Sequence, residues 1–163
     1  GHISVESLKG KGTTFSIYLP ASSRVVEREQ LNGKPASQGK GRVLVMDDED
    51  MIREITGARL KNLGYKVEFA KNGNEAIDLY RESQNLGKPF DVAILDLTVP
   101  GGMGGKETID ELLAIDPKAK AIVSSGYSND PIVTEFQKYG FCGVIIKPYH
   151  LTELSQTLQS VLT

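Results

Sequence analysis

The sequence lacks the features that mark several classes of protein. It has one cysteine, Cys142, and no tryptophan. Because a single cysteine cannot form a disulfide within the chain, we expect a reducing compartment, and we interpret Cys142 as a small buried apolar residue. No apolar run approaches the roughly 18 residues that a membrane span needs, and no signal peptide pattern opens the chain. We therefore expect a cytoplasmic protein without membrane contact in this segment.

An excess of charge of either sign is also missing. The net charge is −2 over 163 residues, which supplies no basic surface for nucleic acid or anionic lipid, so neither is expected as a partner. Apolar residues make up 39% and charged residues 25% of the chain, which is the balance of a folded globular protein rather than a disordered one. The length fits one domain of ordinary size and a shorter additional segment.

The composition divides the chain into three parts. Residues 1–20 alternate polar and apolar side chains in two short runs, His2–Glu6 and Thr13–Leu19, around glycines, and this pattern predicts a β-hairpin. A two-stranded hairpin is marginal by itself in water, so it is expected to need a partner surface. Residues 21–41 are rich in Gly, Ser, Pro and Lys without apolar periodicity, which is typical of a linker. Residues 42–163 form the main domain.

Five short apolar segments, each followed by a helical pattern, organise residues 42–163. Such segments, apolar on both faces, are typical of parallel strands that helices cover on both sides. Right-handed crossovers then predict an α/β fold, a doubly wound (βα)5 parallel sheet with strand order 2-1-3-4-5. The predicted strands are Val43–Met46, Lys66–Phe69, Val92–Leu95, Ala121–Ser124 and Val144–Ile146, and the predicted helices are Asp50–Leu63, Asn74–Arg81, Lys106–Ala114, Pro131–Tyr139 and Leu151–Leu162.

Polar side chains follow four of these strands directly. Asp47 and Asp48 follow the first strand, Asp96 the third, Ser125 the fourth and Lys147 the fifth. The carboxyl ends of parallel strands meet at one edge of the sheet, where doubly wound folds bind their ligands. Three carboxylates without a nearby histidine or cysteine favour Mg²⁺, or Mn²⁺, over zinc. The added ammonium and hydroxyl indicate a phosphoryl group, for which Asp96 is the natural nucleophile.

Each of these residues also has a simpler interpretation. Asp47 and Asp48 are equally well explained as acids at a helix N-terminus, where the helix dipole favours them. A lysine such as Lys147 is most often solvated, and a loop serine such as Ser125 most often binds nearby backbone. Asp96 favours the metal site, because it ends a different strand and no helix turn follows it directly.

Four motifs carry a resemblance to a known family. VLVMDDE, ILDLTVPGG, IVSSG and IIKP occur in this order between about Arg42 and the C-terminus. Their order and spacing resemble the receiver domains of response regulators in two-component phosphorelays, which have a flavodoxin-like fold. The resemblance implies that Asp96 accepts a phosphoryl group from the phosphohistidine of a histidine kinase or a histidine phosphotransfer domain. It also implies autophosphatase capacity, a phosphate contact by Lys147 and a switch role for the Ser125 hydroxyl.

The resemblance further implies a ligand set and a signalling surface. Asp48, Asp96 and the backbone carbonyl of Thr98 would bind Mg²⁺ directly, with Asp47 acting through water. Thr98 and Tyr127 occupy positions that tune the lifetime of the acyl phosphate in this family. Phosphorylation would shift a two-state equilibrium in the face formed by the fourth helix, fifth strand and fifth helix, which could also support a homodimer. The switch aromatic expected on the fifth strand is replaced by Val144.

Residues 1–20 have a resemblance of their own. The segment GKGTTFSIYLP is similar to the closing strand of the ATP-binding domain of a histidine kinase. The nucleotide-binding boxes and the phosphorylatable histidine helix are absent from the sequence. The resemblance therefore implies the C-terminal receiver of a hybrid sensor kinase, whose parent protein could be membrane-anchored, preceded by a remnant hairpin.

Two other functions compete with the phosphoacceptor interpretation. A Mg²⁺-dependent phosphatase with an aspartate nucleophile uses similar groups, but its nucleophile follows the first strand and is followed two residues later by a second aspartate. Here Glu49 lies two residues after Asp47, and Thr98 two residues after Asp96. A receiver-like interaction module without phosphorylation would be expected to lack one of the five site residues, and none is missing. Whether the protein is itself an enzyme remains open from the sequence.

Overall fold

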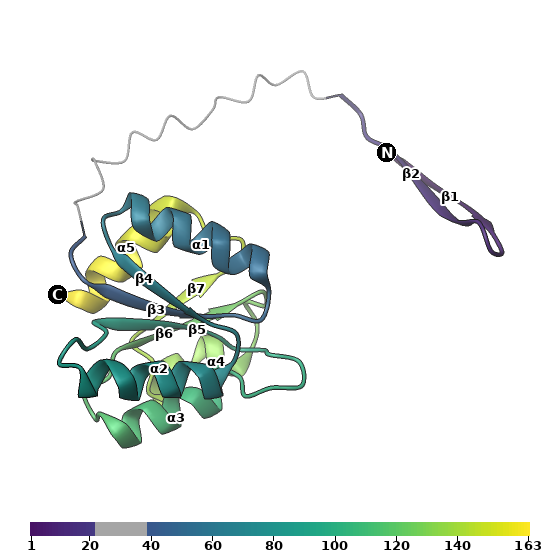
Figure 1. Ribbon diagram of the computed structural model, residues 1–163. Coiled ribbons are helices and arrows are strands. Elements are labelled where there is room, and N and C mark those ends of the chain that lie inside the picture. Colours follow the sequence, from purple (N-terminus) through teal and green to yellow (C-terminus); the bar gives the residue numbers. More distant parts are fainter. Residues whose placement is uncertain (22–38) are drawn as a thin grey trace. The chain divides into compact units, whose positions relative to one another are not determined.

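The computed structural model describes residues 1–21 and 39–163, which belong to two compact units, Gly1–Asn32 and Gly33–Thr163 (Figure 1). Most of the linker predicted for residues 21–41 lies outside the described residues. Gly39, near its end, donates its backbone N–H to the Leu63 carbonyl at 2.7 Å. No helix among the described residues combines the length and the apolar character needed to cross a membrane.

The first unit contains the predicted hairpin. Strand β1, His2–Leu8, pairs antiparallel with β2, Gly12–Tyr18, so both strands begin and end within two residues of the expected positions. Gly10 and Gly12 make the turn with positive φ angles of 80° and 107°, which glycine adopts without strain. The apolar residues of the hairpin lie on one face, where Ile3 pairs with Ile17 and Val5 pairs with Phe15. All four of these side chains are exposed.

The second unit is built on a parallel sheet of five strands. Their order is β4-β3-β5-β6-β7, which confirms the predicted order 2-1-3-4-5 of a doubly wound fold. The strands consist almost wholly of apolar residues, because helices cover both faces. Their bounds are β3 Arg42–Met46, β4 Lys66–Ala70, β5 Val92–Asp96, β6 Ala121–Ser125 and β7 Gly143–Ile146.

Helices form a layer on each side of this sheet. Figure 1 shows α1 and α5 against one face and α2, α3 and α4 against the other. Each layer closes over its own apolar cluster, one containing Ile94 and Leu158, the other Leu95 and Leu112. Successive residues of β5 thus point to opposite faces, as strand geometry requires. The helices are α1 Asp50–Asn62, α2 Gly73–Asn85, α3 Gly105–Ile115, α4 Pro131–Thr134 and α5 Leu151–Leu162.

The fourth helix differs from the prediction. A single helix was expected over Pro131–Tyr139, but α4 ends at Thr134 and a 3₁₀ turn, η1, follows over Phe136–Tyr139. Between them Glu135 leaves the helical region with φ −119° and ψ 31°. Ile132, Val133 and Thr134 are β-branched and lose side-chain freedom in a helix, which weakens it at this point.

Cys142 also differs from the prediction, because it is exposed rather than buried. It lies between Phe141 and Gly143, both buried, immediately before the edge strand β7. Side chains alternate across an extended segment, so Cys142 lies on the same side of the sheet as Val144, which is only half-buried against the α2–α3 cluster. The apolar character of the segment predicted burial correctly for its neighbours, but Cys142 lies beside the edge strand and is exposed.

Candidate functional site

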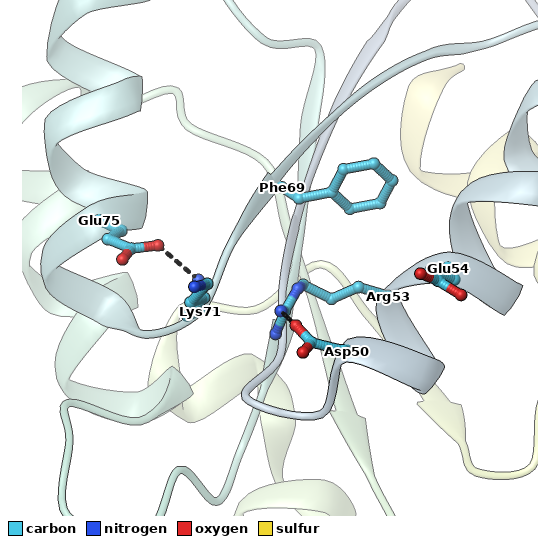
Figure 2. A pocket seen from close by; sticks show the side chains of 6 residues that line it. All are labelled: Asp50, Arg53, Glu54, Phe69, Lys71 and Glu75. Carbon is cyan, nitrogen blue, oxygen red and sulfur yellow. Dashed lines mark hydrogen bonds and ion pairs between the residues drawn. The ribbon is translucent and has the colours of Figure 1, made fainter.

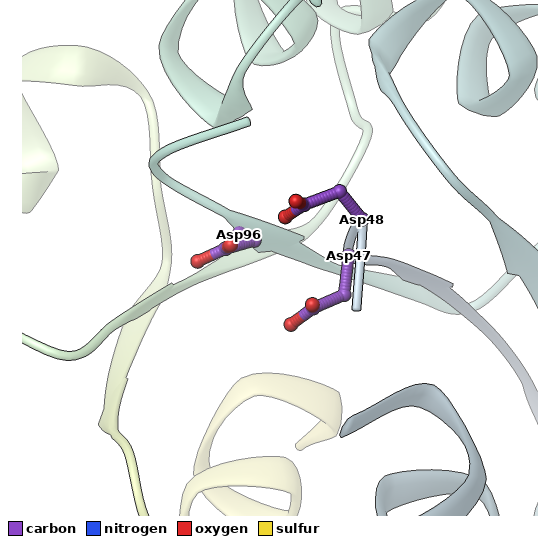
Figure 3. Close-up of side chains that lie close together, drawn as sticks. All are labelled: Asp47, Asp48 and Asp96. Carbon is purple, nitrogen blue, oxygen red and sulfur yellow. The ribbon is translucent and has the colours of Figure 1, made fainter. Parts of the chain in front are cut away.

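Three acidic side chains meet at the carboxyl edge of the sheet. Carboxylate oxygens of Asp47, Asp48 and Asp96 all lie within 4.8 Å of one another. Figure 3 shows the side chains reaching into a common space from the chain just after β3 and from the end of β5. Asp47 and Asp96 are buried, with 1% and 6% of their surface exposed, whereas Asp48 is open to solvent. The prediction that these residues converge is therefore realised in the fold.

The turn after β3 allows adjacent aspartates to face one space. In an extended strand Asp47 and Asp48 would point to opposite faces, but here the chain already turns toward α1. Arg53, buried on the inner face of α1, donates to the Asp47 carbonyl and pairs with Asp50. The Asp47 carboxylate in turn accepts a hydrogen bond from the Glu49 N–H at 3.0 Å. Arg53 was not among the predicted site residues, and its spacing of three from Asp50 is its local signal in the sequence.

Lys147 completes the charged cluster. Its Nζ lies 2.6 Å from Asp47 Oδ2 and 3.1 Å from Asp96 Oδ1, and the side chain is 15% exposed. Burial lowers the pKa of Lys147, but the bond to Asp47 and the charge of Asp96 outweigh it, so that the pKa is raised overall. The lysine thus stays charged beside the acids. The peptide bond from Lys147 to Pro148 is cis.

One ammonium does not balance three acids, and the imbalance is visible at Asp96. The pKa of Asp96 is raised to about 6 overall: burial raises it most, Lys147 lowers it, and the neighbouring charges of Asp47 and Asp48 also raise it. A divalent cation would relieve this repulsion. The donor set consists of carboxylate oxygens alone, which suits a hard cation such as Mg²⁺.

The loop after Asp96 leads into α3, whose first residue lies very close to the end of β5. A Cβ at Gly105, the first residue of α3, would lie 2.8 Å from the Asp96 carbonyl oxygen. Glycine is therefore required for α3 to start against the end of β5. Thr98, predicted to contribute its carbonyl to a metal, lies in this loop and is exposed.

Ser125 is buried at the end of β6, with 2% of its surface exposed. Its Oγ accepts a hydrogen bond from the Tyr127 N–H at 3.1 Å and approaches the Tyr127 carbonyl at 3.3 Å. These are the local backbone bonds that a loop serine commonly makes. The Tyr127 side chain is 75% exposed. The hydroxyl therefore stands at the correct edge of the sheet while bound within its own loop.

A further residue near the site, Tyr149, follows Lys147 by two positions and was not among the predicted site residues. Its hydroxyl lies 2.6 Å from Ser124 Oγ, and both residues are buried. Arg59 of α1 donates to the Tyr149 carbonyl. No local pattern could have indicated the contact with Ser124, because 25 residues separate the two. Val144, at the switch position itself, packs half-buried against the core on the α2–α3 side.

A separate groove of about 310 Å³ lies between α1 and the start of α2 (Figure 2). Its lining mixes acidic and basic side chains around one aromatic ring, which favours no particular ligand chemistry. None of the predicted site residues takes part. The lining residues are Asp50, Arg53, Glu54, Phe69, Lys71 and Glu75.

The sequence is similar to receiver domains of known proteins. The family model described as "Response regulator receiver domain" matches residues 43–159. The chemotaxis protein CheY of Thermotoga maritima is 36% identical over 74% of this chain and 96% of its own length. The sensor kinase CckA of Brucella abortus is 31% identical over 99% of this chain, which spans only 18% of that kinase.

Solved structures show the same likeness. Chemotaxis protein CheY4 of Vibrio cholerae superposes with a TM-score of 0.67 at 28% identity, covering 76% of this chain and all of its own. Response regulator TrrA of Thermotoga maritima, solved in complex with Mg²⁺ and BeF, superposes with a TM-score of 0.63 at 29% identity, covering 75% of this chain and 99% of its own.

Proposed function

The chain belongs to the response regulator receiver domain family of two-component signalling, and we propose that Asp96 is its phosphoacceptor. The observation that carries this assignment is the placement of the buried Asp96 carboxylate within reach of the Lys147 ammonium, beside two further acids. The donor is a phosphohistidine of a histidine kinase or of a histidine phosphotransfer domain, as is general for receivers.

The proposed reaction is a phosphoryl transfer to a carboxylate. An oxygen of Asp96 bonds to phosphorus as the bond from phosphorus to the donor imidazole breaks, and the imidazole leaves with that electron pair. Asp96 must be ionised to act, and its pKa of about 6 makes this the dominant state at neutral pH. Lys147 is placed to counter the negative charge that the phosphoryl oxygens bring.

The acid cluster suits the cofactor proposed for this reaction, Mg²⁺, with Mn²⁺ as a substitute. We assign Asp48, Asp96 and the carbonyl of Thr98 as direct ligands and Asp47 as a ligand through water. When bound, the cation neutralises charge on the carboxylates and on the incoming phosphoryl oxygens. The cluster of three carboxylates and the solvent access of Asp48 support this assignment.

The proposed switch begins at Ser125. Its hydroxyl would exchange its bonds to Tyr127 for a bond to a phosphoryl oxygen, and this exchange would reshape the loop between β6 and α4. Thr98 and Tyr127 flank the site and would set the lifetime of the acyl phosphate. With Val144 at the usual aromatic position, the α4–β7–α5 face responds without an aromatic relay, and the same face is the proposed homodimer surface.

The origin of the chain is proposed from the N-terminal unit. The match to the sensor kinase CckA extends over 99% of this chain and so includes the hairpin, whereas the receiver family begins at residue 43. We assign residues 1–20 as the last strands of a kinase ATP-binding domain, 21–41 as a linker and 42–163 as the receiver of a hybrid kinase. An antibody against the receiver should then detect a native protein much larger than this chain.

Phosphorylation itself is tested by intact mass. The protein is incubated with Mg²⁺ and acetyl phosphate, and a single base-labile phosphoryl adduct is expected that is absent from Asp96→Asn and from samples with EDTA. Asp78→Asn, which changes an exposed aspartate on α2, is the matched control and should form the adduct normally. Rapid turnover of acetyl phosphate without an adduct would favour the phosphatase alternative, and inertness in the presence of Mg²⁺ would favour a pure interaction module.

A further inference from the structure

Two buried hydroxyl groups form a bridge beneath the acid cluster. Tyr149 Oη and Ser124 Oγ are 2.6 Å apart, with 6% and 1% of the residues' surfaces exposed. Burial raises the pKa of the Tyr149 phenol, which therefore keeps its proton at neutral pH and can share it with the serine. Neither group is exposed enough to exchange its partner for bulk water.

The apolar packing around Tyr149 and Ser124 could be formed without their hydroxyl groups. The Tyr149 ring belongs to the apolar cluster between the sheet and the α1–α5 layer, where a phenylalanine ring would contact the same neighbours. Ser124 follows Ile122 by two residues on β6, and Ile122 is fully buried in that cluster. A polar pair in this setting is maintained only by its mutual hydrogen bond, because removing one hydroxyl leaves the other without its partner.

The bridge joins the two segments that carry the reactive groups. Ser124 is the cross-strand neighbour of Asp96, and its carbonyl accepts the N–H of Leu97 at 2.9 Å. Tyr149 lies two residues after Lys147, whose own N–H donates to the Ser125 carbonyl at 2.8 Å. The side-chain bridge therefore links the end of β5 and β6 to the turn that follows Lys147.

A third attachment holds the same turn to α1. Arg59 of α1 donates to the carbonyl of Tyr149. With the backbone bond at Lys147 and the hydroxyl bridge at Tyr149, the turn is attached to β6 twice and to α1 once. Of these three attachments, the bridge is the one made between two side chains, and it can be removed without altering the backbone.

We propose that the Tyr149–Ser124 hydroxyl pair positions the Lys147 ammonium between Asp47 and Asp96. The proposal rests on the phosphorylation site assigned above and adds to it two positioning residues that do not touch the phosphoryl group. Loosening the turn would let the ammonium move away from the carboxylates, and small displacements of a charged group in a reaction site are costly.

Three single substitutions test this role. Tyr149→Phe and Ser124→Ala each remove one hydroxyl of the bridge. Tyr80→Phe is the matched control, because Tyr80 is also buried and its hydroxyl donates to Asp116 at 3.2 Å, outside the acid cluster. In protein labelled with ¹³C at the lysine ε-carbons, the Lys147 signal is identified by its loss in Lys147→Arg. We expect this signal to shift toward that of solvated lysines in the two bridge variants and not in the control.

Kinetics provide the second measurement. At saturating Mg²⁺ and acetyl phosphate, each bridge variant should form the adduct about tenfold more slowly, while its Kd for Mn²⁺, measured by electron paramagnetic resonance, changes by less than about twofold. In a Lys147→Met background, Tyr149→Phe should cause no further slowing, because the group that it positions is gone.

Several outcomes overturn the proposal. An unchanged Lys147 signal in both bridge variants does so, and so does slowing that persists in the Lys147→Met background. Equal slowing in Tyr80→Phe would show that loss of any buried tyrosine hydroxyl has the same effect. If the unaltered protein forms no adduct, the proposed function fails, and the Lys147 signal then decides the positioning role separately. If Tyr149→Phe does not fold, Ser124→Ala gives the same test.

Discussion

The hairpin β1–β2 and the sheet β3–β7 are both held by backbone pairing, antiparallel in the hairpin and parallel in the sheet, and they differ completely in burial. In the hairpin all seven residues of β1 pair with β2, yet Phe15 is 66% and Ile17 is 65% exposed. In the sheet, Val45 and Ile94 are each 1% exposed. Backbone pairing is therefore enough to form a strand, whereas burial shifts the pKa of an ionisable side chain at its end. The raised pKa of Asp96 has burial as its first cause.

The largest expected contrast between the two regions is in stability. Leu44 of β3 is fully buried, and Leu44→Ala should lower the free energy of unfolding of the receiver by about 3 kcal/mol through lost contacts and the cavity left behind. Ile17→Ala in the hairpin should change it by less than about 0.5 kcal/mol. Urea unfolding followed by circular dichroism measures both. A loss above about 1 kcal/mol for Ile17→Ala would mean that the hairpin is covered by another surface.

A smaller effect of burial should appear in the pH dependence of stability. Without metal, folded Asp96 keeps its proton up to a pKa of about 6, against 3.8 for an ordinary aspartate. Between these values the folded state binds more protons than the unfolded state, so the contribution of Asp96 to stability falls as the pH rises from about 4 to 6. Asp96→Asn should therefore raise the melting temperature at pH 7, by roughly 3 °C, and have little effect at pH 4.

Thermal unfolding in EDTA across pH 4 to 7 checks this prediction, with Asp78→Asn as the control. Asp78 is exposed on α2, so its substitution should leave the melting temperature unchanged at every pH. Added Mg²⁺ should stabilise the unaltered protein more than the Asp96→Asn variant. A gain from Asp96→Asn of equal size at pH 4 and pH 7 would contradict burial as the cause.

The smallest effect is expected from removing the hairpin altogether. Deletion of residues 1–20 removes both strands of the hairpin and leaves every residue of the acid cluster, which lies in the other unit. The rate of adduct formation with acetyl phosphate and the Kd for Mn²⁺ should stay within about twofold of the full chain. A change of tenfold or more in either quantity would show that the hairpin and the receiver are energetically coupled.

Much of the fold could be predicted because its signals are local. The helix α5 begins and ends at the predicted residues Leu151 and Leu162, since its inward leucines repeat at helical spacing. The strand Val92–Leu95 was predicted one residue short of the observed end at Asp96, because a charged residue interrupts the apolar pattern there. The division of the fourth helix at Glu135 was missed, since its sequence keeps a helical apolar pattern while β-branched residues weaken it.

The candidate site divides in the same way. Asp47, Asp48, Asp96 and Lys147 could be chosen from the sequence, because each directly follows an apolar strand and strand ends converge in a parallel sheet. For Ser125, the sequence could not distinguish hydrogen bonds to the Tyr127 backbone from a contact with phosphate, because both would use the same hydroxyl. The exposure of Cys142 was missed because composition predicts how buried a segment is and not how buried each of its residues is.

By itself, the sequence determined the succession of strands and helices and the reactive groups, because periodicity and residue chemistry are properties of short segments, and right-handed crossovers then predicted the type of fold. Only the tertiary structure decided how those groups are held. Arg53 reaches the carbonyl of Asp47, and Tyr149 reaches Ser124 across 25 residues. Contacts of this kind depend on how α1 and α5 pack on the sheet, and that packing sets the burial from which the chemistry of Asp96 follows.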